Sequence, residues 1–174
     1  LGSHQRILPG DINLMVAGSG IVHSERETDA VRQREHAQHG LQLWLALPAE
    51  QESMPPAFHH IDAASIPSAE INGVRVRVLM GAAYGFNSPV PVFSPTLYIE
   101  ASLQAGQRLE LPEADERGLY VVKGSVNLNG SVVQQGSMAI LGNMQQLEIQ
   151  SRENTQIVMI GGESLGKRFI EWNF

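Results

Sequence analysis

The chain has 174 residues, of which 43% are apolar and 17% are charged, so it can bury the core of one large domain or two small ones. A net charge of -6 and scattered basic residues argue against direct binding to nucleic acid, which depends on clustered Lys and Arg. The absence of cysteine excludes disulfides and thiolate chemistry, and no apolar run reaches the roughly 18 residues of a membrane-spanning helix. We therefore expect a cytoplasmic protein without a membrane segment.

The beginning of the chain predicts strands separated by a long polar loop. Residues 12–17 form an apolar run after a Pro-Gly-Asp turn, and a Gly-Ser-Gly bend separates this run from a second predicted strand at 21–25. The charged stretch 26–39 is predicted to be a loop. Residues 40–48 are predicted to be a strand with Trp44 in the core. The prolines between 48 and 67 then indicate a connector.

The rest of the chain predicts many short strands joined by turns. Residues 74–79 alternate between apolar and charged side chains, and Asn129-Gly130 is typical of a hairpin turn. Further strands are predicted at 96–103, 108–111, 119–123, 125–129, 131–133, 138–141, 147–149 and 155–160. Short strands at this regular spacing favour an all-β barrel or sandwich.

The histidines are confined to the first third of the chain. They are His4, His23, His36, His39, His59 and His60. A domain that starts near residue 70 therefore cannot build a histidine metal site. Its acidic residues Glu113, Asp115 and Glu116 are predicted to be an exposed turn.

His23 and Glu25 are the candidate metal ligands. They lie two positions apart in a predicted strand, so both side chains would face the same side. An imidazole and a carboxylate are ligands of non-haem iron centres. The spacing alone leaves a polar strand edge as the commoner alternative. His36 and His39 are predicted to be solvated, and the His59-His60 pair is predicted to make connector contacts.

Several runs, taken in order, resemble the pirin family. The most specific run is 9–25, which contains His23-Ser24-Glu25, and it is followed by 39–48. Shorter matches are 88–90, 94–98 leading to Gly106, 161–163 and 171–174. The resemblance implies an all-β fold of two cupin (jelly-roll type) barrels, with the first barrel incomplete in this chain because it begins inside that barrel. It also implies a C-terminus cut short after 171–174.

The resemblance further implies domain boundaries and a metal site. Residues 1–58 would be the remainder of the metal-binding barrel, 59–70 a linker and 71–174 a metal-free barrel. One mononuclear metal ion, iron, would be held by three histidines and one glutamate. Only His23 and Glu25 match that set. The other two ligands, an H-x-H pair, would lie before Leu1, and nothing in this chain replaces them.

Two functions follow from the resemblance. One is metal-dependent quercetin 2,3-dioxygenase-type activity on a small, flavonol-like aromatic substrate, with Glu25 also a catalytic base for the substrate hydroxyl. The alternative is a non-enzymatic, iron-dependent regulator that binds a protein partner, of the transcriptional co-regulator type. The acidic charge suits a protein partner better than DNA.

Overall fold

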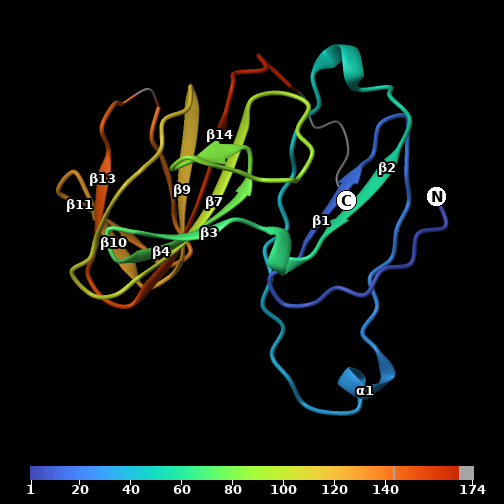
Figure 1. Cartoon of the computed structure of the whole chain (residues 1–174), viewed down its shortest axis with the longest axis horizontal. Coiled ribbons are helices and arrows are strands. Elements are labelled where there is room, and N and C mark those ends of the chain that lie inside the picture. The colour runs from blue at the N-terminus through green and yellow to red at the C-terminus, as the bar shows by residue number, and fades with distance from the viewer. Residues whose placement is uncertain (143, 169–174) are drawn as a thin grey trace.

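The structure is a computed structural model that describes residues 1–142 and 144–168 (Figure 1). Strands dominate it, which confirms the predicted all-β class. The helical pieces are short: α1 (Asp29–Arg32), η1 (Ala49–Gln51) and η2 (Ala63–Ser65). The strands are β1 (Ile12–Val16), β2 (Ala57–Ile61), β3 (Ser68–Ile71), β4 (Val74–Met80), β5 (Ala82–Ala83), β6 (Phe86–Asn87), β7 (Thr96–Leu103), β8 (Arg108–Glu110), β9 (Glu116–Lys123), β10 (Ser125–Leu128), β11 (Ser131–Gln134), β12 (Met138–Ile140), β13 (Glu148–Ser151) and β14 (Thr155–Gly162).

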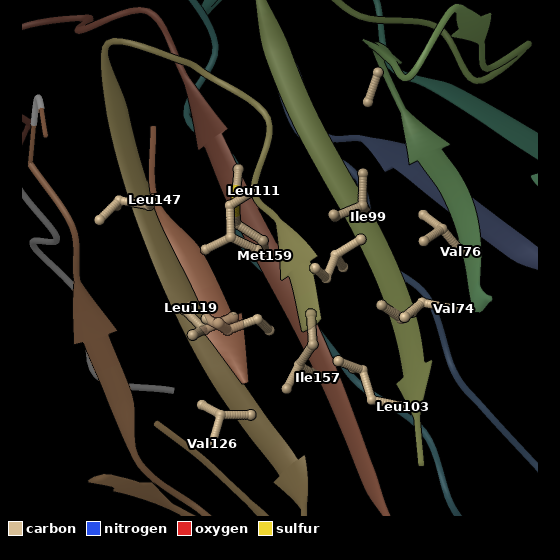
Figure 2. Close-up of a cluster of buried hydrophobic side chains, with 14 of the residues drawn as sticks. Val74, Val76, Ile99, Leu103, Leu111, Leu119, Val126, Leu147, Ile157 and Met159 are labelled. Carbon is tan, nitrogen blue, oxygen red and sulfur yellow. The ribbon is translucent and has the colours of Figure 1, made fainter. Parts of the chain in front are cut away.

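A barrel of two antiparallel sheets contains most of these strands. One sheet has the order β12-β9-β14-β7-β4-β3, and the other has the order β11-β10-β13-β8. Alternate side chains of most strands point between the two sheets and meet there, as Figure 2 shows for Leu119 and Ile157 of the six-stranded sheet and Val126 of the four-stranded sheet, all of which are fully buried. The predicted second domain is therefore a barrel that encloses an apolar core. Most of its strands lie where the sequence alternates between apolar and polar residues.

The first part of the chain lies beside the barrel (Figure 1). Its β1 and β2 form an antiparallel pair in which Ile12 is opposite Ile61 and Val16 is opposite Ala57. Apolar side chains of this pair, Ile12, Leu14 and Ile61, pack against a second buried cluster. That cluster consists of Ile66, Leu79, Met80 and Val90. The strand pair is thus attached to the barrel by its own small apolar core.

Two strand predictions in the first part of the chain are wrong. Residues 21–25 and 40–48 have no regular secondary structure. Among the described residues, no strand is paired with either segment, so neither makes the inter-strand hydrogen bonds that define a strand. Trp44, which we predicted to be buried, exposes 62% of its surface. The predicted loop at 26–39 is confirmed, except for the single turn α1.

The predicted connector contains more structure than its prolines indicate. Strand β2 lies inside it, and residues 59–70 include the end of β2, helix η2 and the start of β3. The half-buried sequence of β2 lacks an apolar alternation, because two of its five residues are histidines. The exact domain boundary stays a prediction. The pirin-like run 171–174 lies outside the described residues. Among the described helices, none has the length and apolar character of a membrane-spanning segment.

Candidate functional site

His23 and Glu25 lie in the irregular segment between Gly20 and Thr28, and both are exposed. Their neighbour Val22 exposes 94% of its surface. Among the described residues, neither side chain makes a hydrogen bond or an ion pair, and neither is grouped with further His, Asp or Glu side chains at metal-binding distances. The structure therefore leaves the predicted ligand pair open to solvent and does not test whether both bind one ion.

A different cluster of potential ligands lies at the end of the β1–β2 pair. It consists of Asp11, His60 and Asp62, whose ligand atoms all lie within 4.8 Å of one another. His60 Nε2 is 3.0 Å from Asp62 Oδ1 and 3.7 Å from Asp11 Oδ2. From the sequence we predicted only a connector contact for His60, and no role for Asp11. The signal for Asp11 was its place in the Pro-Gly-Asp turn.

Hydrogen bonds fix the orientation of the two half-buried members of this cluster, His60 and Asp11. His60 Nδ1 lies 2.9 Å from Asn13 Oδ1, and because that oxygen is an acceptor, Nδ1 is the donor. Nε2 therefore faces the two carboxylates. Nε2 donates a hydrogen bond to the carboxylates when the ring is protonated. When a cation is bound between the three side chains, Nε2 is instead one of its ligands. The Asp11 carboxylate also accepts the N–H groups of Ala63 at 2.9 Å and Leu8 at 2.8 Å.

Asp11 thereby connects three segments of the chain, and its pKa reflects these contacts. Desolvation by itself raises the pKa of Asp11. The hydrogen bonds from Leu8 and Ala63, with the charges of His60 and Arg77, outweigh this effect and lower the pKa below its ordinary value. The ionised carboxylate therefore stabilises the attachment of the turn at 8–11 to strand β2 and helix η2.

This shift predicts an acid-dependent loss of stability. Because the folded-state pKa lies below the unfolded-state value of about 3.9, the contribution of Asp11 is complete above that value and is lost as the pH falls through the folded-state pKa. We expect Asp11→Asn to destabilise the protein at pH 6 and to reduce the stability difference between pH 5 and pH 2.5. Urea unfolding at several pH values measures both effects. An unchanged pH profile in the variant would assign the acid sensitivity to other carboxylates.

Comparison with known proteins identifies two parts of the chain. Residues 1–45 match the family model described as Pirin, and residues 98–174 match the Pirin C-terminal cupin domain. A pirin-like protein of Caulobacter vibrioides is 39% identical, covering 100% of this chain and 61% of that protein. A Pseudomonas aeruginosa protein that is named provisionally as a quercetin 2,3-dioxygenase is 35% identical, over 100% of this chain and 55% of its own length.

A solved structure shares the fold over almost all of the chain. The crystal structure of quercetin 2,3-dioxygenase from Acinetobacter baumannii superposes with a TM-score of 0.87 at 30% identity, covering 98% of this chain and 56% of that protein. The cupin-type fold predicted from the sequence is thus confirmed. This chain spans little more than half the length of these relatives. The two matching family models and the relatives together establish that the chain belongs to the pirin family.

Proposed function

We propose that this protein has metal-dependent quercetin 2,3-dioxygenase-type activity, with one iron ion held by His23 and Glu25 as two of its ligands. The observation that carries the proposal is the superposition on the solved quercetin 2,3-dioxygenase, with a TM-score of 0.87 at 30% identity. The matched Pirin region, residues 1–45, contains both side chains. A second relative whose provisional name states the same activity adds support.

The chemistry of the two side chains suits this metal, but the described residues provide only part of a coordination sphere. Imidazole and carboxylate are the donors of non-haem iron sites. Neither His23 nor Glu25 has a further His, Asp or Glu ligand grouped with it in the part of the chain that the structure describes. We propose that the remaining ligands are the H-x-H pair that the pirin resemblance places before Leu1.

The two ligands have different proposed roles. His23 would hold the ion through a neutral ring nitrogen. Glu25 would be a second ligand and would accept the proton of a flavonol hydroxyl, because a carboxylate is a suitable general base for an acidic phenol. Iron bound by these residues would supply Lewis-acid chemistry to the substrate oxygen.

Iron content and flavonol turnover test this proposal together. The protein is expressed with its natural flanking residues, and elemental analysis is expected to find about one iron per chain. Loss of quercetin absorbance, with matching consumption of O2, is then expected to require that iron and to stop after chelation. A fully loaded protein that leaves quercetin unchanged would exclude the enzymatic proposal.

The second candidate is an iron-dependent regulator that binds a protein partner. It is favoured by exposed apolar side chains in the segment 41–45, where Leu41, Leu43 and Leu45 each expose more than 40% of their surface. Apolar surface of this kind is typical of protein contacts. A pull-down with the iron in each oxidation state tests it. Specific capture in one state alone, without quercetin turnover, would favour the regulator over the enzyme.

A further inference from the structure

We propose that a cavity between the first part of the chain and the barrel binds the phosphate or carboxylate group of a small molecule. The cavity has a volume of about 240 Å³. Its one wall is the turn at Pro9 and Gly10, together with Ala63. Its other wall is the outer face of β3, β4 and β7, which presents the side chains of Ser68, Arg75, Arg77, Glu100 and Ser102.

Two of the three charged groups in this cavity compensate each other. Arg77 and Glu100 are opposite each other on β4 and β7, and Arg77 Nη1 donates to Glu100 Oε2 at 3.1 Å. A second donor of Arg77 bonds the carbonyl oxygen of Gly10. Glu100 Oε1 accepts from Gln156 Nε2 at 2.7 Å. These contacts hold the pair in place, so it contributes no net charge to the cavity.

Arg75 is the uncompensated charge. In the described part of the chain its guanidinium makes no hydrogen bond and no ion pair, although five N–H donors are available. Its cross-strand neighbour on β3, Glu70, is exposed and does not line the cavity. Its neighbour on β7 is Ser102, which does line the cavity. The side chains that line the cavity thus include two arginines and one carboxylate, in a chain whose net charge is -6.

The shape of these donors matches an oxyanion. A guanidinium donates two parallel N–H bonds to a carboxylate or a phosphate, and such charge-assisted bonds are about twice as strong as neutral ones. The hydroxyls of Ser68 and Ser102 provide further donors on the same sheet face. A water occupies about 30 Å³ of liquid volume, so the cavity has room for an oxyanion with a short substituent.

The site is separate from the proposed metal ligands. None of the residues lining the cavity belongs to the segment that contains His23 and Glu25. The cavity is formed by both the turn at Pro9-Gly10 and the barrel, so an anion bound there strengthens the contact between the two. Anion binding is therefore expected with or without iron, and it can be measured apart from turnover.

Calorimetric titration at constant ionic strength tests the proposal, with inorganic phosphate and malonate as the two probes. We expect saturable binding of at least one, and the tighter probe identifies the head group. Arg75→Gln is expected to weaken binding about tenfold, while Arg75→Lys retains part of it. Arg108→Gln is the matched control: Arg108 is an exposed arginine that pairs with Glu148 on the other sheet, and its loss is expected to leave binding unchanged.

A charge change of opposite sign completes the test. Glu100→Gln keeps the shape of the side chain and removes the one negative charge of the cavity, so it is expected to tighten anion binding several-fold. The proposal is overturned if neither probe binds saturably, or if Arg75→Gln binds as well as the unmodified protein. It is also overturned if Arg108→Gln weakens binding as much as Arg75→Gln, because the effect would then come from the total charge of the protein and not from a specific site.

Discussion

Replacing His23 with alanine is expected to remove most of the bound iron and to lower flavonol turnover by at least about 100-fold in the protein with its natural flanking residues. A metal site that loses one of its imidazole ligands binds the ion more weakly and with altered geometry, since both properties depend on the number and type of ligands. Elemental analysis and quercetin absorbance measure the two effects. The exposure of His23 in this structure makes a global folding defect an unexpected result, and circular dichroism checks for one.

Two further variants separate the metal site from other effects of losing a histidine. His4→Ala removes an exposed imidazole outside the run 9–25 that contains His23 and Glu25, so iron and turnover are expected to stay unchanged. Glu25→Gln retains the side-chain size but removes the basic carboxylate, so turnover is expected to fall more than iron content. If His23→Ala keeps its iron while Asp62→Asn loses it, the ion is bound by the Asp11, His60 and Asp62 cluster instead.

The barrel could be predicted from the sequence because most of its strands have one buried face. In β4 the residues alternate between buried valines and exposed or half-buried arginines, and β7 alternates in the same way. This period of two is a local property that each segment carries by itself. The sheet order, in which β14 lies between β7 and β9, depends on pairings between distant segments and was not predicted.

The first part of the chain could be predicted less well, because its elements depend on neighbours rather than on their own pattern. Residues 21–25 and 40–48 have strand-like composition, yet in the described structure they have no partner strand. Strand β2 has the opposite property: it has no alternation of apolar and polar residues, but pairing with β1 makes it a strand. Propensity is a weak guide wherever pairing decides the outcome.

The candidate site residues likewise differ in whether a local sequence pattern could indicate them. His23 and Glu25 are neighbours in sequence, so a motif could indicate them. The contact of His60 with Asn13 joins residues 47 positions apart and follows from the register of β1 and β2. The cavity around Arg75 likewise combines three strands and a turn, and no local pattern contains it. Sites assembled by register become visible only in the structure.

Gly81→Ala is expected to destabilise the protein by about 3 kcal/mol or more. Gly81 lies between β4 and β5 with a φ of +73°, a conformation that costs alanine energy on its own. A methyl group there would also lie 1.9 Å from the carbonyl oxygen of Thr96. Thr96 begins β7 and is held by its pairing with Gly162 of β14, so that carbonyl cannot withdraw without disturbing the six-stranded sheet.

Gly130→Ala separates the steric clash from the backbone cost. Gly130 has a similar φ of +83°, but nothing lies within 4 Å of the position that its added methyl would take. It is therefore expected to lose only about 1 kcal/mol, the cost of a left-handed alanine. Urea unfolding of both variants measures the difference. Equal losses would show that the contact with Thr96 relaxes, and that the path of the chain from β4 into β5 is more adaptable than its packing against β7 indicates.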